Sequence, residues 1–204
     1  MKKIILFIVL SLGIGVGVKA QEFKAGITAG LIASQVDGDR MGGYYKAGFV
    51  GGLYVYRDFG AASRLQAEIL YAMKGSRCSP KNTNPDLLQV STINIDISVS
   101  YIYKVLDWLN FRIGLTPSVL LTSSEITPTG LIIEPREAPA FRTFGVLGLA
   151  GVTYHLSQHL TLTWTYNYSL YSIRSGESEI YSLSYKEKNA QHHNYMAFSL
   201  GYTF

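Results

Sequence analysis

The end of the chain alternates strictly between two kinds of side chain. From Asn194 to Phe204, large apolar residues recur at every second position, and mostly small or polar residues lie between them. A period of two over about ten residues predicts a β-strand with one apolar and one mostly polar face, because successive side chains of a strand point to opposite sides. About ten residues is also the length of a tilted strand that crosses a bilayer. The pattern therefore favours an all-β protein whose strands meet lipid.

The same alternation recurs along the chain. It is clearest in 160–173, where Leu, Trp and Tyr alternate with Thr, Asn and Ser, and least defined in 23–34, 46–57 and 142–155, which are rich in Gly and Ala. Glycine permits the strong bending that a narrow barrel needs. Altogether the sequence predicts eight strands, at 23–34, 46–57, 64–75, 91–104, 109–121, 142–155, 160–173 and 194–204.

The connections between these strands alternate in length. Short turns are expected at 58–63, 105–108 and 156–159, and longer polar segments at 35–45, 76–90, 122–141 and 174–193. Short periplasmic turns and long outer loops are typical of bacterial outer-membrane barrels. We therefore predict an eight-stranded antiparallel up-and-down transmembrane β-barrel in the outer membrane. An even number of strands would place both termini in the periplasm and all long loops outside the cell.

The beginning of the chain has the pattern of an export signal. Met1, Lys2 and Lys3 precede an apolar run at 4–18, and small residues end at Ala20. The alternative is a membrane anchor, but the run is shorter than the roughly 20 residues of a spanning helix. We expect a cleaved signal peptide at 1–20 and one barrel domain at 21–204.

Cleavage would remove most of the positive charge. The whole chain has 18 Lys and Arg against 14 Asp and Glu, and without Lys2, Lys3 and Lys19 it has 15 against 14. This balance does not favour nucleic-acid binding, which needs a clustered basic face. Cys78 is the single cysteine, so an internal disulfide is excluded, and its polar surroundings predict an incidental loop residue.

Alternation alone does not say which face points outward, because a soluble lipocalin-type barrel has its apolar face inside. The predicted inner face here carries charges of both signs, which could pair inside a narrow lumen but would be costly in lipid. Aromatic residues gather near the strand ends of the other face, as in membrane girdles. The lumen is therefore expected to be plugged by a structural network of Glu68, Lys74, Asp96, Lys104 and Arg112.

The last strand ends the chain on an aromatic residue. Its apolar face resembles the terminal signal that the outer-membrane barrel assembly machinery reads. The residues of this expected signal are Phe198, Leu200, Tyr202 and Phe204.

Four stretches resemble the small PorT-like and OmpX-like outer-membrane barrels of Bacteroidota: 23–30, 65–75, 112–117 and 198–204. The resemblance lies in spacing and glycines, and it implies the barrel fold and an outer-membrane location. Ala67 stands where the family often has Pro before the glutamate of the third strand, which puts the subfamily in question. A founding member is linked to protein secretion, and that role is kept here only as an alternative.

Some small outer-membrane barrels act on lipids, so a catalytic site is a further alternative. His192 and His193 precede the last strand, near the loop residues Ser175, Glu177, Ser178, Glu179 and Ser182. Neighbouring strand residues point to opposite faces, so the two histidines are not expected to serve one site. His155 and His159 fall at the opposite end of the barrel. We predict no enzyme activity, no cofactor and no metal site.

The predicted function is structural or based on surface interactions through the outer loops. The expected partners are outer-membrane lipid, the assembly machinery, and extracellular or periplasmic proteins that the sequence does not identify. The barrel itself is expected to be monomeric. The alternatives are a narrow pore or component of protein secretion, and a lipid-modifying enzyme.

Overall fold

The computed structural model describes residues 23–39, 41–79, 88–126, 132–133, 141–174 and 191–204. The expected signal peptide, 1–20, lies outside these ranges and stays a prediction. In the described part of the chain, no helix is long and apolar enough to cross a membrane.

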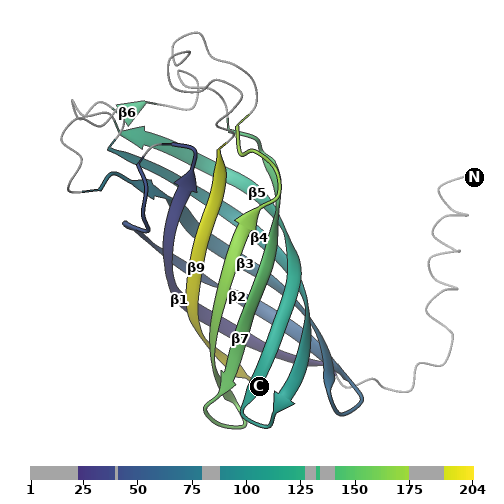
Figure 1. Cartoon of the computed structure of the whole chain (residues 1–204). Helices are drawn as coiled ribbons and strands as arrows, with labels where there is room; N and C mark the ends of the chain where they lie inside the picture. Colours follow the sequence, from purple (N-terminus) through teal and green to yellow (C-terminus); the bar gives the residue numbers. More distant parts are fainter. Residues whose placement is uncertain (1–22, 40, 80–87, 127–131, 134–140, 175–190) are drawn as a thin grey trace, which may run out of the picture.

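Eight long antiparallel strands and one very short strand form the structure (Figure 1). All eight predicted strands are present, with ends that differ by up to five residues. The fifth is longer than predicted and the seventh is shorter, and the two-residue strand in the expected long loop was not predicted. The strands are β1 (Lys24–Asp37), β2 (Lys46–Phe59), β3 (Ser63–Arg77), β4 (Gln89–Leu106), β5 (Leu109–Ile126), β6 (Ile132–Ile133), β7 (Phe144–His155), β8 (Leu160–Ser169) and β9 (His192–Thr203).

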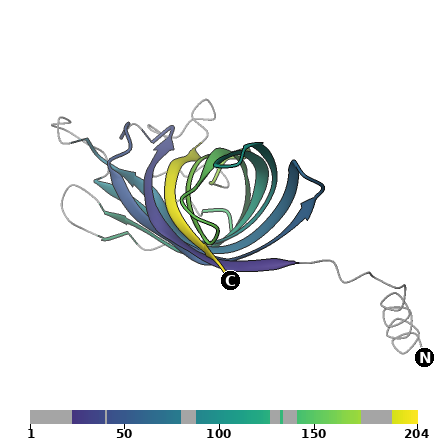
Figure 2. The ribbon, with the colours of Figure 1, turned by 90° about the horizontal axis from the view of Figure 1, so that it is seen from below.

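The strands close into a barrel. β1 pairs with both β2 and β9, and β4 pairs with both β3 and β5, so the eight long strands form a ring around the lumen (Figure 2). A path along paired residues that leaves β1 at Lys24 returns to it at Ser34, a displacement of ten residues. Such a stagger requires strands that tilt about 35–45° from the barrel axis. The predicted antiparallel eight-stranded barrel is confirmed.

The apolar face of each strand points outward. Leu31 on β1 and Ile113 on β5, for example, are 69% and 64% exposed, whereas the inward neighbours Ile32 and Arg112 are buried. The aromatic residues expected in a girdle also lie outside and exposed at one end of the barrel. These are Tyr101, Tyr103, Trp108, Phe111, Tyr202 and Phe204. This polarity is that of a lipid-facing barrel and is the reverse of a lipocalin.

The two ends of the barrel differ. The connections β2–β3, β4–β5 and β7–β8 are short. They lie at the same end of the barrel as the C-terminus, here called the turn end (Figure 1). The strand ends that the other four connections join lie at the opposite end, here called the loop end. The predicted sorting of short and long connections is therefore present.

Glycine is required where β2 packs most closely against β3. A Cβ atom on Gly48 or Gly52 would lie 1.9 Å from the carbonyl oxygen of Met73 or Ile69. No side chain fits at that distance, so these two glycines permit the tight curvature of the wall.

Candidate functional site

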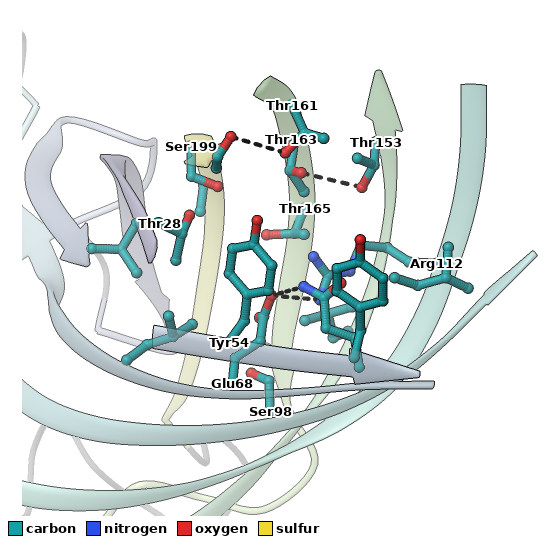
Figure 3. Close-up of a pocket in the computed structure, with 18 of the residues that line it drawn as sticks. Thr28, Tyr54, Glu68, Ser98, Arg112, Thr153, Thr161, Thr163, Thr165 and Ser199 are labelled. Carbon is teal, nitrogen blue, oxygen red and sulfur yellow. Dashed lines mark hydrogen bonds and ion pairs between the residues drawn. The ribbon is translucent and has the colours of Figure 1, made fainter. Parts of the chain in front are cut away.

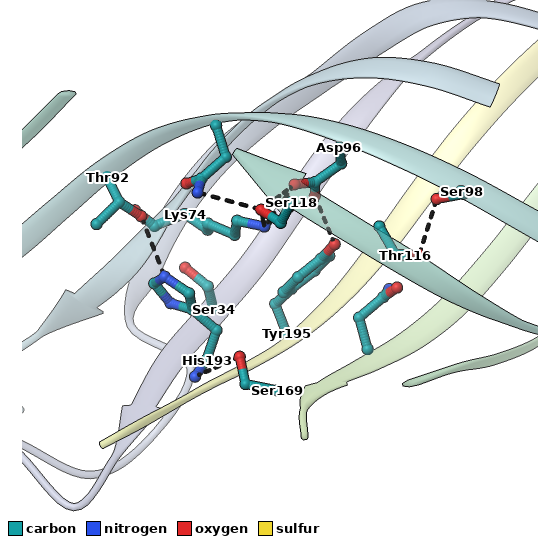
Figure 4. A network of polar contacts seen from close by, with 12 residues as sticks. Ser34, Lys74, Thr92, Asp96, Ser98, Thr116, Ser118, Ser169, His193 and Tyr195 are labelled. Atoms are coloured by element: carbon teal, nitrogen blue, oxygen red, sulfur yellow. Dashed lines mark hydrogen bonds and ion pairs between the residues drawn. The ribbon is translucent and has the colours of Figure 1, made fainter. Parts of the chain in front are cut away.

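A buried ion pair between two neighbouring strands lies inside the lumen, in the half nearer the loop end. Lys74 Nζ on β3 donates to both carboxylate oxygens of Asp96 on β4, at 2.9 and 2.8 Å. The two side chains are 0% and 1% exposed. Ser118 Oγ also donates to Asp96, at 2.6 Å, and Tyr195 Oη donates at 3.1 Å (Figure 4). The carboxylate is thus neutralised and hydrogen-bonded on both oxygens, which a buried charge requires.

Apolar and polar side chains fill the space around this pair. Lys74 Nζ lies 5.1 Å from the centre of the Tyr195 ring, and Asn94 donates to Ser118 Oγ at 3.2 Å. A small apolar cluster packs beside them and consists of Ile32, Val50, Ala72, Leu147, Tyr195 and Ala197. We call Lys74, Asp96, Ser118, Tyr195 and this cluster the plug.

The loop end has a second layer of contacts beyond the plug. Arg174, after β8, pairs with Glu125 on β5, donates to Gln191 at 2.7 Å and stacks over the Phe141 ring. Glu125 and Arg174 are both buried. These contacts tie the β5–β7 and β8–β9 connections to the barrel rim.

The connection between β1 and β2 is also tied to the rim. Ser76 Oγ on β3 donates to Asp39, and the Met41 backbone N–H donates to the same carboxylate at 2.8 Å. Burial raises the pKa of the Asp39 carboxyl, although both hydrogen bonds oppose the shift. This segment therefore covers part of the loop end.

The half of the lumen nearer the turn end contains a cavity of about 50 Å³ (Figure 3). Arg112 on β5 pairs with Glu68 on β3 at 3.1 Å and donates to Ser100 at 2.7 Å. Arg112 Nε is buried without a hydrogen-bond partner among the described residues. The opposite wall presents hydroxyl groups, from Thr28, Thr153, Thr161, Thr163, Thr165 and Ser199. A buried water needs roughly 10–15 Å³ of such space, so about four waters fit here.

Asp58 holds two cations at the mouth of the turn end. It accepts from Arg64 at 2.8 Å and from Lys104 at 3.0 Å. The side chains of Lys104 and Asp58 are 28% and 31% exposed, so this group is partly solvated. Arg64 also stacks over the Tyr56 ring at 3.7 Å.

Of the five charges expected to form one network, four lie in the lumen as two separate buried pairs, Lys74–Asp96 and Arg112–Glu68. Lys104 lies at the mouth instead, half-buried. Sequence reasoning missed its partner Asp58, which falls in the segment expected as a turn, and Arg64, the first residue of the expected strand 64–75.

Glu125 and Arg174 were also missed. Glu125 lies beyond the expected end of its strand, where a register shift between β4 and β5 breaks the period of two: Leu121 and Thr122 are both exposed. Arg174 follows β8 in a connection. In the sequence, the available signal was Glu125 itself, an acidic residue just beyond the alternating run.

The structure separates the adjacent histidines. His192 faces outward, where its ring stacks on Tyr168 at 5.6 Å and Nδ1 donates to the Ser169 carbonyl at 3.0 Å. His193 faces the lumen, with Nε2 3.5 Å from Thr92 Oγ1. The loop residues considered with them, Ser175, Glu177, Ser178, Glu179 and Ser182, lie outside the described residues.

The other two histidines lie at the turn end. Asn110 donates to His155 Nε2 at 2.7 Å, and His159 Nδ1 donates to the Thr203 carbonyl at 2.9 Å. Among the described residues, no three His, Cys, Asp or Glu side chains are grouped so that they could hold a metal ion. Cys78 is half-buried near the loop end, where its N–H donates to the Leu88 carbonyl.

The last strand completes the ring between β1 and β8. The residues of the expected assembly signal all lie on its exposed outer face: Phe198, Leu200, Tyr202 and Phe204. Their reading by the assembly machinery stays a prediction.

Comparison with solved structures gives the same architecture. The structure of Neisserial surface protein A (NspA) is similar with a TM-score of 0.54 at 14% identity, over 89% of this chain and 97% of that chain. Ail, the attachment invasion locus protein of Yersinia pestis, in complex with the heparin analogue sucrose octasulfate, gives a TM-score of 0.50 at 11% identity, over 90% and 99%. At such identities the likeness shows the fold alone.

Comparison of sequences identifies the family. No curated protein matches the chain. A family profile described as "Outer membrane protein beta-barrel domain" matches residues 19–175, which is more than half of the chain. The outward apolar faces and the closed ring agree with this match. The chain therefore belongs to the outer membrane protein beta-barrel domain family.

Proposed function

We propose that this outer-membrane barrel is a non-conducting, monomeric surface protein whose long loops contact partners outside the cell. The termini would lie in the periplasm, and the barrel would belong to the PorT-like and OmpX-like group of Bacteroidota. The observation that carries the proposal is the plug around Lys74 and Asp96. A lumen that is closed by side chains leaves the loops as the part of the molecule that can meet other molecules.

The plug is built to stay closed. A solute crossing it would have to separate Lys74 from Asp96 and leave each charge in a narrow, poorly hydrated lumen, which costs several kcal/mol per ion. The second layer, Glu125 with Arg174, would have to open as well. Two successive buried ion pairs support a structural role for the lumen.

The bases of the connections are held in place. Glu125–Arg174 fixes the segments after β5 and β8, Asp39–Ser76 fixes the segment after β1, and Tyr44 Oη donates to Asn194 Oδ1 at 2.7 Å. A fixed base reduces the ordering cost when a loop binds a partner. The undescribed part of the last long connection, 175–190, carries charges of both signs in the sequence, so its charge does not favour a strongly anionic partner.

The orientation can be tested with two epitope insertions in the native bacterium. One insertion follows Ser182 in the β8–β9 connection, and the matched control follows Gly60 in the β2–β3 turn. We expect antibody to label the first insertion on intact cells and the second only after permeabilisation of the outer membrane. The reverse pattern would contradict the proposed orientation and the role of the loops.

We further propose that the protein is not an enzyme. The support is that His192 and His193 face opposite sides of the wall. Deletion of the gene should leave lipid A and phospholipids unchanged in a lipid analysis. A lipid species that accumulates in the deletion strain, and disappears on complementation, would overturn this.

The secretion alternative predicts a different phenotype. If the barrel were a component of protein export, proteins normally released from the cell would accumulate in the periplasm of the deletion strain. We expect the periplasmic fraction to be unchanged, because the closed lumen offers exported chains no path.

A further inference from the structure

The outer face of β7 has a shallow depression between larger side chains on the neighbouring strands β5 and β8. Two consecutive outward residues of β7 are small, Gly148 and Ala150. Leu115 and Tyr168 are their paired neighbours at the first position, and Ile113 and Tyr166 at the second. In each of these two rows of paired residues, the small side chain on β7 therefore lies between two large side chains. These residues line an apolar groove of about 530 Å³, which we call the β7 valley.

Larger residues end the valley along β7. The outward residues on either side of the small pair are Val146 and Val152. They are six residues apart, which is about 20 Å along a strand. The walls on β5 and β8 are two strand spacings apart, or roughly 10 Å. The side chains of β5 and β8 occupy part of this distance. The remaining width of the β7 valley is about that of one hydrocarbon chain.

The glycine in the valley is not needed for backbone packing. A Cβ atom on Gly148 would meet only Leu170 Cδ2, at an ordinary 3.5 Å, whereas Gly52 is forced by a carbonyl oxygen at 1.9 Å. An alanine or larger residue would therefore be accepted by the fold at position 148. What the glycine does provide is the depth of the valley.

The tyrosine wall is held in place by its own contacts. The Tyr168 ring stacks on the His192 ring at 5.6 Å with an angle of 11° between the planes. His192 is in turn fixed by its hydrogen bond to the Ser169 carbonyl. A wall that is ordered before the ligand arrives lowers the cost of binding.

We propose that the β7 valley binds one acyl chain of an outer-membrane lipid. The valley lies within the belt of outward apolar side chains that faces hydrocarbon, so its occupant meets it from the bilayer. Its lining is aliphatic and aromatic, and its width suits a single flexible chain. Such a chain gains contacts with three sides of the valley that the flat parts of the barrel do not offer.

The test is native mass spectrometry of the mature protein purified from its own outer membrane in mild detergent. We compare the wild type with Ala150→Leu, which fills the floor, and with Ala29→Leu as the matched control. Ala29 is an exposed outward alanine on β1, between Gly51 and Leu200 and outside the valley. We expect wild type and A29L to retain one lipid per barrel at equal occupancy, and A150L to retain about tenfold less.

Folding is checked separately for every variant by the heat-dependent shift of the barrel on a detergent gel. If A150L does not fold, Gly148→Leu provides a second way to fill the valley, since a Cβ there meets only Leu170 Cδ2, at an ordinary contact distance. Equal lipid retention in the wild type and the filled variant, or no retained lipid in the wild type, would overturn the proposal. So would a dimer mass that A150L loses and A29L keeps, because the occupant would then be a second copy of the chain.

Discussion

The two halves of the lumen are built from the same strands but are filled differently. In the half toward the loop end, Lys74 and Tyr195 both contact Asp96 and all three are almost fully buried, and the cavity beside them is only about 30 Å³. In the half toward the turn end, short threonine side chains line one wall, and a cavity of about 50 Å³ remains. Each half holds one buried ion pair, Lys74–Asp96 or Arg112–Glu68, and the turn end adds the partly solvated pair Lys104–Asp58 at its mouth.

The difference shows that polar inward residues do not by themselves decide whether a barrel is closed. The arrangement of the side chains decides it. Lys74 and Tyr195 both contact Asp96 from different strands, whereas short threonines face the Arg112–Glu68 pair in the other half. The alternation of the sequence predicts the polarity of both halves equally and does not show this difference.

The largest expected effect comes from removing the buried cation of the plug, in comparison with the partly solvated cation at the mouth of the turn end. Lys74→Met leaves Asp96 buried without a positive partner, which should destabilise the barrel by about 3–5 kcal/mol. Lys104→Met removes a half-exposed cation, and Asp58 keeps Arg64, so the expected loss is under about 1 kcal/mol. Urea unfolding of both variants in lipid vesicles, followed by gel mobility, measures the difference. Equal losses would contradict the assignment of Lys74–Asp96 as a buried pair and Lys104–Asp58 as a partly solvated one.

A smaller effect is expected from adding volume to each half. Ser118→Leu removes a donor to Asp96 and leaves the buried carboxylate with one hydrogen bond fewer, with an expected cost of about 3 kcal/mol. Thr163→Leu projects into the cavity and gives up only its hydroxyl contact with Thr153 at 3.1 Å, so stability should change by less than about 1 kcal/mol. The same urea titration checks this, and a T163L loss as large as that of S118L would show that the cavity is already full.

The smallest expected effect concerns pH at the loop end. Burial raises the pKa of Asp39 in the folded protein, so folding favours the protonated carboxyl. The ionised group therefore weakens the fold at neutral pH, and this penalty is relieved as the pH falls through the raised pKa. Asp39→Asn lacks the titration, so the wild type should gain stability relative to D39N between pH 7 and pH 4. A wild type that loses stability relative to D39N over this range would contradict the assignment.

Much of this architecture could be predicted from the sequence, and the reason is physical. A strand in lipid must place apolar residues outward at every second position, so 160–173 and 194–204 show their faces directly. The alternation of loop lengths gave the up-and-down order. Strand ends were harder, because the β4–β5 register shift hides the continuation of β5 to Ile126.

The site was less predictable than the fold. Lys74, Asp96, Glu68 and Arg112 were found because inward charges in a lipid-facing strand need partners. Their pairing depends on the stagger between strands, which no single strand encodes. The β7 valley depends on three neighbouring strands in register, so Gly148 and Ala150 reveal it only after Leu115 and Tyr168 are placed beside them.

The most direct test of the closed lumen is the conductance of the purified mature barrel in planar lipid bilayers. The heat-dependent gel shift confirms beforehand that the inserted protein is folded. The structure predicts no sustained single-channel current, because the Lys74–Asp96 plug blocks the lumen between the cavity and the loop end. Sustained unitary currents from folded protein would contradict the plug and would move the function from surface contact to transport.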